Sequence, residues 1–158
     1  MVLAVHTQRV LKANRQSAIG NRQFTEIGNF TTTVMQIGDV VSWRRTFTEE
    51  EIRAFARLSG DEGEHHLVPD EHGRLMAHGL LTATLPTKIG GDMHFIARQM
   101  TFEFHRPVFA GDAIECEVTL VELEPGDQYT RVAAQIVCRN QSGKEVMTGQ
   151  TRGVIRNS

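Results

Sequence analysis

Cysteine, proline and aromatic residues are scarce in this chain, and long apolar runs are missing altogether. Two cysteines and four prolines occur in 158 residues, and aromatic residues make up 6%. A disulfide framework needs more cysteines in a shorter chain, so we expect Cys116 and Cys138 to be buried free thiols in a reducing compartment. No run of about 18 apolar residues can form a transmembrane helix, and the N-terminus lacks the apolar core of a secretory signal. These absences favour a cytoplasmic protein without a membrane partner.

A strong net charge and the common cofactor motifs are missing as well. The formal net charge is -2, which provides no field that would attract the chain to nucleic acid. The sequence contains no GxGxxG, P-loop, GxSxG, HExxH or CxxC motif. It therefore offers no standard nucleotide, serine-hydrolase or zinc site. We expect no cofactor, no metal ion and no nucleic-acid partner.

The composition that remains is that of one globular domain preceded by a basic leader. Hydrophobic residues make up 40% and charged residues 23%, and the length suits a single core. Residues 1–25 carry basic side chains and no acidic one. Such a leader is either an organelle transit peptide or a surface segment that wraps a neighbour, and we favour the second interpretation. We expect residues 1–36 to form a weakly patterned extension and residues 37–158 to form the folded domain.

Residues 40–60 carry the clearest local pattern. Residues 40–47 predict a strand. Thr48 and Glu51 have the spacing of a capping box, which opens a helix with an apolar face. Gly60 is expected to end this helix, because glycine is common in the left-handed position after the last turn.

The rest of the chain predicts a loop, an apolar helix and four strands. Residues 61–77 are polar and predict a loop, whereas residues 78–85 predict a helix buried on most sides. Pro86 must kink that helix, shorten it or begin a new turn. Period-two stretches predict strands at residues 95–104, 114–120, 129–139 and 146–155. We expect an α+β fold in which an antiparallel meander wraps the apolar helix.

Asp61 and His66 are the first candidates for chemistry. They lie five residues apart, just after the first helix, and a loop of that length can turn both side chains toward one point. Histidine exchanges protons near neutral pH, and a nearby carboxylate can orient it or share the proton transfer. On spacing alone, however, surface capping and solvation are the commoner roles for such residues.

His78 and Gly79 begin the apolar helix and form a second candidate. Free N–H groups at a helix start can bind a developing oxyanion, and Gly79 lets a ligand approach the backbone. The alternatives are a hydrogen-bonded histidine, a packing glycine and, for Thr84 further along, a core threonine that bonds to its own helix. The histidines from 65 to 78 are dense enough to bind a metal, but their spacing matches no zinc motif.

Three stretches together resemble the MaoC-like, (R)-specific enoyl-CoA hydratase branch of the hotdog-fold superfamily. Residues 47–61 followed by His66 look like the family's first helix and its Asp-x4-His motif. Residues 77–81 (Ala-His-Gly-Leu-Leu) look like the start of the central helix, and residues 104–112 look like a family strand–turn segment. Relatives usually carry Asn-Pro inside the motif, where this chain has Gly63 and Glu64.

The resemblance implies a hotdog fold, a homodimer with active sites near the interface, and a lyase of fatty acid metabolism. Asp61 and His66 would hold a water that attacks the β-carbon of a trans-2-enoyl thioester, carried by coenzyme A or an acyl-carrier protein. The Gly79 N–H would stabilise the thioester enolate, with His78 also at this oxyanion and substrate site. Thr84 would stand where relatives often carry a serine that positions the pair.

Two other functions stay open at this stage. A hotdog thioesterase would use the same helix start with Glu62, Glu64 or Asp61 as its base. In a non-catalytic acyl-CoA binding or assembly module, the altered motif would mark lost chemistry, and acyl-CoA would bind without turnover.

Overall fold

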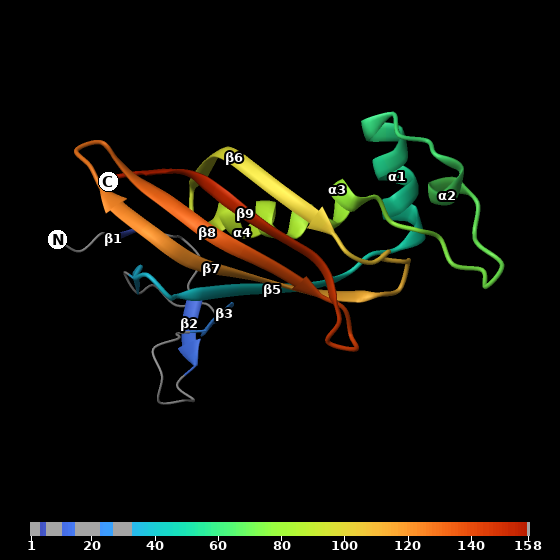
Figure 1. Ribbon diagram of the computed structural model, residues 1–158, viewed down its shortest axis with the longest axis horizontal. Helices are drawn as coiled ribbons and strands as arrows, with labels where there is room; N and C mark the ends of the chain where they lie inside the picture. Colours follow the sequence, from blue (N-terminus) through green and yellow to red (C-terminus); the bar gives the residue numbers. More distant parts are fainter. Residues whose placement is uncertain (1–3, 6–10, 15–22, 27–32, 158) are drawn as a thin grey trace.

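A computed structural model describes residues 4–5, 11–14, 23–26 and 33–157 of the chain. A long sheet and a set of helices make up this part of the molecule (Figure 1). The strands are β1 (Ala4–Val5), β2 (Leu11–Asn14), β3 (Gln23–Glu26), β4 (Thr33–Val34), β5 (Val40–Thr46), β6 (Phe95–Phe104), β7 (Ala113–Pro125), β8 (Tyr129–Arg139) and β9 (Glu145–Arg156). The helices are α1 (Glu49–Ser59), α2 (Glu64–Leu67), α3 (Gly79–Thr82) and α4 (Thr84–Asp92).

The main sheet has the strand order β2-β3-β5-β7-β8-β9-β6. All its pairs are antiparallel except β3 with β5. The predicted strands and the meander through β7, β8 and β9 are confirmed. The prediction was wrong for β6, which pairs with β9 at the edge and not with β7. Residues 105–112 between β6 and β7 are too long for a tight hairpin, and Pro107 cannot continue a ladder.

The sheet curves around α3 and α4, which lie on its concave face (Figure 1). The two helices are separated at Ala83, and Pro86 lies in the first turn of α4, where a missing backbone donor costs little. Pro86 therefore begins a new turn, which was one of the three predicted outcomes. The α+β prediction is confirmed, since apolar side chains from both layers form one core: Leu81, Leu85, Ile89, Ile114, Val118, Leu120 and Ile136.

The capping box at the start of α1 is confirmed. The Glu51 backbone N–H donates to the Thr48 hydroxyl over 3.2 Å, and the Thr48 N–H donates to the Glu51 carboxylate over 3.0 Å. Gly60 ends the helix with a φ of 76°, a left-handed value that favours glycine. The prediction of an unbroken loop at residues 61–77 was wrong, because α2 forms within it and carries His66.

Part of the predicted extension forms short strands. β1 pairs with β4, and β3 pairs with the edge of β5 through Gln23–Val40 and Phe24–Val41. Three of the basic residues of the predicted leader, Arg9, Arg15 and Arg22, lie outside the described residues. The domain boundary after residue 36 stays a prediction.

The two cysteines face each other across β7 and β8. Cys116 and Cys138 are paired in register, buried and free of a disulfide, as predicted. A hydrogen bond with Cys138 and burial together raise the pKa of the Cys116 thiol. Within the part of the chain that is described, no helix has the length and apolarity needed to cross a membrane.

Candidate active site

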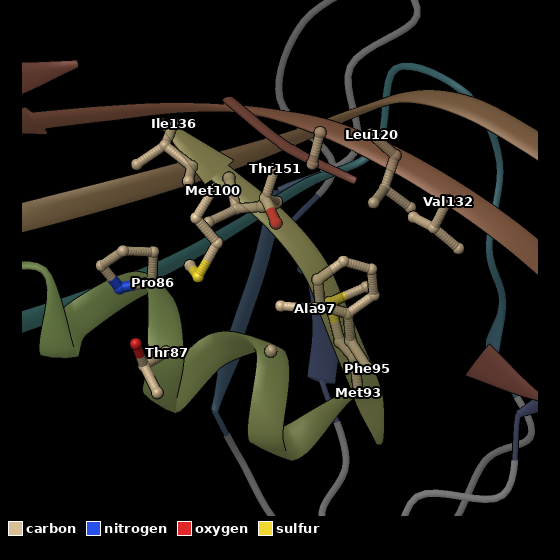
Figure 2. Close-up of a pocket in the computed structure, with 13 residues that line it drawn as sticks. Pro86, Thr87, Met93, Phe95, Ala97, Met100, Leu120, Val132, Ile136 and Thr151 are labelled. Carbon is tan, nitrogen blue, oxygen red and sulfur yellow. The ribbon is translucent and has the colours of Figure 1, made fainter. Parts of the chain in front are cut away.

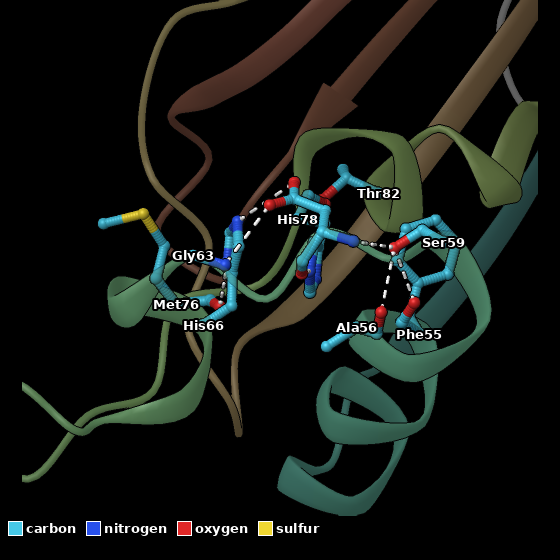
Figure 3. Close-up of polar contacts among 9 residues, drawn as sticks. Phe55, Ala56, Ser59, Gly63, His66, Met76, His78 and Thr82 are labelled. Atoms are coloured by element: carbon cyan, nitrogen blue, oxygen red, sulfur yellow. Dashed lines mark hydrogen bonds and ion pairs between the residues drawn. The ribbon is translucent and has the colours of Figure 1, made fainter.

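Three short segments bring Asp61, His66 and His78 together. The helices α1, α2 and α3 that flank these residues lie beside one end of the sheet (Figure 1), and Figure 3 shows His66 next to His78. Asp61 follows the cap of α1, His66 lies in α2, and His78 is the residue before α3. One side-chain donor atom from each residue lies within 4.8 Å of the other two. The folded chain therefore unites the two candidate motifs that the sequence separates.

His66 is buried, with 5% of its surface exposed. Its Nδ1 lies 2.8 Å from the Met76 carbonyl oxygen, and its Nε2 lies 3.8 Å from the Asp61 carboxylate. A carbonyl oxygen only accepts hydrogen bonds, so Nδ1 carries the proton and donates it. With Nδ1 protonated, the neutral form of the ring has its lone pair on Nε2. This is the tautomer that a general base needs on the side facing Asp61.

The Asp61 side chain is 61% exposed and lies at the open side of the group. One carboxylate oxygen accepts a long 3.4 Å hydrogen bond from the Gly63 N–H, and the other faces His66. The 3.8 Å gap between carboxylate and imidazole exceeds a direct hydrogen bond. The gap suits one water molecule that contacts both groups.

His78 is the most deeply buried of the three, with 2% of its surface exposed. Its Nε2 donates to the backbone carbonyl of Asp61 over 2.9 Å. Its ring stacks on His66 with centroids 3.5 Å apart and planes 20° apart. The Nε2 of His78 is therefore directed to Asp61 and not to a substrate oxygen.

Gly79 begins α3, and its N–H has no partner among the described residues. A Cβ at this position would lie 2.8 Å from the Phe104 ring, so Gly79 allows this aromatic side chain to pack on the helix start. Because α3 has four residues, any oxyanion stabilisation there depends on the N–H itself more than on a long helix dipole.

The structure does not bring Thr84 to this group. The Thr84 hydroxyl donates to the Leu81 carbonyl over 2.6 Å, which is the back-bonded alternative that the sequence left open. Thr82, which sequence reasoning missed, is buried and lines the cavity instead. The chain breaks between α3 and α4 at Ala83, so that Thr82 and not Thr84 lines the cavity. No local sequence pattern predicts this break.

A cavity of about 650 Å³ opens over these residues. Besides the three polar side chains and Gly79, its lining includes Phe55, Met76, Leu80, Phe104, Arg106 and Val108. Arg106 adds a positive charge, and its guanidinium donates to the Glu145 carbonyl over 2.5 Å. The sequence placed Arg106 in a strand–turn segment and did not indicate it as a site residue.

A second, smaller cavity of about 80 Å³ lies between α4 and the sheet. Figure 2 shows Pro86 and Thr87 on the helix, and Phe95, Met100 and Ile136 on the strands that face it. Thr87 and Thr151 are its only hydroxyl-bearing residues. Its walls are otherwise apolar, so the cavity suits a hydrocarbon group.

The histidine geometry does not suit a metal ion. Asp61, His66 and His78 form a possible donor set, but the two imidazoles lie nearly parallel. An imidazole binds a metal in the plane of its ring, and an ion shared by two stacked rings would lie outside both planes. Of the other histidines, His65 packs against His66 with ring centroids 3.9 Å apart, and His72 is exposed beside Glu71.

No family model matches this sequence. The chain is 30% identical over 129 residues to an (R)-specific enoyl-CoA hydratase from Rhodospirillum rubrum. The aligned region covers 75% of this chain and 86% of that relative. It is 25% identical over 145 residues to a mitochondrial 3-hydroxyacyl-[acyl-carrier-protein] dehydratase from Arabidopsis thaliana, which covers 86% of each protein. Among solved structures, an (R)-hydratase from A. caviae involved in PHA biosynthesis is similar with a TM-score of 0.68 and 26% identity. The match covers 77% of this chain and 96% of that chain.

Proposed function

Since this chain belongs to the MaoC-like, (R)-specific enoyl-CoA hydratase family of hotdog-fold proteins, we propose that it hydrates trans-2-enoyl thioesters and, in reverse, dehydrates 3-hydroxyacyl thioesters. The observation that carries the proposal is the contact between His66 Nδ1 and the Met76 carbonyl oxygen, with His66 Nε2 on the side of Asp61. A ring that donates from Nδ1 to Met76 presents its Nε2 lone pair 3.8 Å from Asp61. This arrangement holds and deprotonates a water molecule.

The reaction follows from these contacts. His66 Nε2 takes a proton from the water as the water oxygen bonds to the β-carbon. The electron pair of the double bond moves toward the thioester, and an enolate develops on the carbonyl oxygen. The Gly79 N–H donates to that oxygen. The Asp61/His66 pair then passes a proton to the α-carbon, so that one water is added and the pair is restored.

The two cavities divide the substrate between them. The larger one, which opens over Asp61 and carries Arg106, receives the thioester and its carrier. The smaller apolar one beside α4 receives the end of the acyl chain. Coenzyme A and an acyl-carrier protein present the same pantetheine thioester, so both are candidate carriers of the acyl group.

The functional unit in this proposal is a homodimer formed through β6. This strand is the outer edge of the sheet, and its backbone groups on one side have no strand partner among the described residues. Ile96, Met100 and Phe104 are exposed along it. Arg98 and Glu103 have no ion-pair partner in the described chain. Antiparallel pairing of two copies about the point between residues 100 and 101 would place each Arg98 opposite the other copy's Glu103.

We propose that residues 1–36 form an extension of a hotdog domain at residues 37–158. We also propose that the protein is located in the cytoplasm. The short strand β3, which pairs with the edge of β5, supports a surface role for the extension.

Absorbance of the enoyl thioester tests the proposed reaction. Asp61→Asn and His66→Gln should each lower kcat by roughly 10²–10⁴-fold, because each removes one half of the proton-transfer pair. His72→Gln is the matched control, since this histidine is exposed and lies outside the cavity. Full activity in both site variants would refute the mechanism. Release of free thiol in place of hydration would identify a thioesterase, and binding without turnover would identify a binding module.

A further inference from the structure

His78 contacts both members of the proton-transfer pair. Its Nε2 donates to the backbone carbonyl of Asp61, and its ring lies flat against that of His66. Phe55 packs against His78 as well, with ring centroids 5.0 Å apart. The imidazole is therefore held between α1 and α2 (Figure 3).

The hydrogen bond to Asp61 matters because that residue has few other restraints. Asp61 follows the C-cap of α1, and its own N–H donates to the Ser59 hydroxyl over 3.1 Å. Its carboxylate is mostly exposed and, among the described residues, accepts one hydrogen bond, the long one from Gly63. The bond from His78 is the contact that ties this segment to α3.

The stacking contact limits the orientation of His66. Among the described residues, the His66 ring makes one hydrogen bond, through Nδ1, so rotation of the ring about that bond would move Nε2 away from Asp61. The His78 ring, 3.5 Å from His66, blocks this rotation on one face. The Nδ1 atom of His78 is buried and has no hydrogen-bond partner in the described residues. A buried polar atom without a partner is unfavourable, which indicates that the position of this ring serves more than packing.

We propose that His78 is a positioning residue that sets the distance between Asp61 and His66 through one hydrogen bond and one stacking contact. This inference rests on the proposed hydratase function. It assigns His78 no contact with the reacting atoms. The same residue links the pair to the oxyanion site, because the Thr82 N–H donates to the His78 carbonyl over 3.1 Å and Gly79 follows directly.

Two substitutions separate the two contacts. His78→Gln retains an N–H donor near the position of Nε2 and removes the ring, whereas His78→Phe retains a ring and removes the donor. Each should lower kcat by about 10- to 100-fold, the loss expected when a reacting group is displaced by about 1 Å. KM should change less than twofold, since His78 does not bind the substrate. His72→Gln and His72→Phe are matched controls.

A double-variant cycle tests whether His78 acts through Asp61. If it does, adding His78→Phe to Asp61→Asn should lower kcat much less than His78→Phe does alone. Nitrogen-15 spectra of labelled histidine should show that His66 keeps its Nδ1–H tautomer in His78→Gln, because the Met76 carbonyl and not His78 sets it. Circular dichroism and thermal unfolding establish which variants fold, and the glutamine variant keeps the test decisive if the phenylalanine variant does not.

Wild-type kcat in either folded variant, or independent losses that multiply in the double variant, would overturn the positioning role. An inactive wild-type protein would instead refute the proposed function. The two failures are therefore distinguishable.

Discussion

The Nδ1 atom of His66 donates a hydrogen bond to the backbone carbonyl oxygen of Met76 over 2.8 Å. Met76 is held in turn by an antiparallel bridge to Phe109, beside the Ala77 N–H that donates to Val108 over 2.8 Å. The tautomer of His66 is therefore set by a loop that a distant segment holds in place. This link connects the chemistry of α2 to the turn that follows β6.

Filling the small cavity should shorten the preferred acyl chain. Gly90 lies on α4 at the wall of this cavity, and a Cβ there would lie 3.4 Å from Phe95, an ordinary contact. Gly90→Leu should therefore fold and occupy the space that a longer chain needs. We expect kcat/KM to fall at least tenfold for long enoyl thioesters, a loss of about 1.4 kcal/mol, and less than threefold for short ones. Gly91→Leu, at an exposed position with open space, is the control, and an unchanged chain-length profile in Gly90→Leu would place the acyl group elsewhere.

Charge reversal on β6 should break and restore the homodimer. Arg98→Glu would place like charges opposite each other in the proposed register, so we expect monomers at micromolar concentrations. The double variant Arg98→Glu/Glu103→Arg should recover the dimer. Light scattering during size-exclusion chromatography gives the mass, with Arg57→Glu on the exposed face of α1 as control. A monomeric wild-type protein, or no recovery in the charge-swapped variant, argues against this interface.

Loss of the capping box should destabilise α1 and the site that follows it. Thr48→Ala removes the hydroxyl that accepts from the Glu51 N–H, so we expect the free energy of unfolding to fall by about 0.5–2 kcal/mol. Denaturant titration measures this change. Arg57→Ala, a replacement within the same helix by another good helix former, should change it by less than about 0.5 kcal/mol. Equal stability of Thr48→Ala and wild type would mean that packing alone holds the helix start.

The buried thiol pair should make stability depend on alkaline pH. The pKa of Cys116 is raised in the folded state by its hydrogen bond with Cys138 and by burial, whereas the unfolded thiol ionises at its ordinary value of 9.0. Below that pH the thiol is protonated in both states and adds no pH dependence. Above it, the unfolded state loses a proton that the folded state keeps, so stability should fall by roughly 1.4 kcal/mol per pH unit.

Comparison with Cys116→Ala isolates this effect. The difference in unfolding free energy between wild type and variant should be constant below pH 9 and should shrink above it. Both thiols should also resist a thiol reagent until the protein unfolds. Rapid labelling of the folded protein would contradict the burial of the two thiols.

The sequence by itself determined the elements whose causes are local. Thr48, Glu51 and Gly60 predict the bounds of α1 because a cap and a left-handed glycine depend on a few consecutive residues. The alternation from Ile114 to Leu120 predicts one buried face of β7 for the same reason. Asp61 and His66 could be named as a pair only through the family resemblance, since their spacing is equally compatible with an exposed helix end.

The tertiary structure alone decided how those elements meet. It placed β6 beside β9, formed α2 within a polar loop, replaced Thr84 by Thr82 at the cavity, and directed His78 toward Asp61. Each of these outcomes depends on partners ten or more residues away or on a break between two helices. Such contacts form because buried polar groups must find hydrogen-bond partners and apolar faces must be covered, and both conditions are met only when the whole chain has folded.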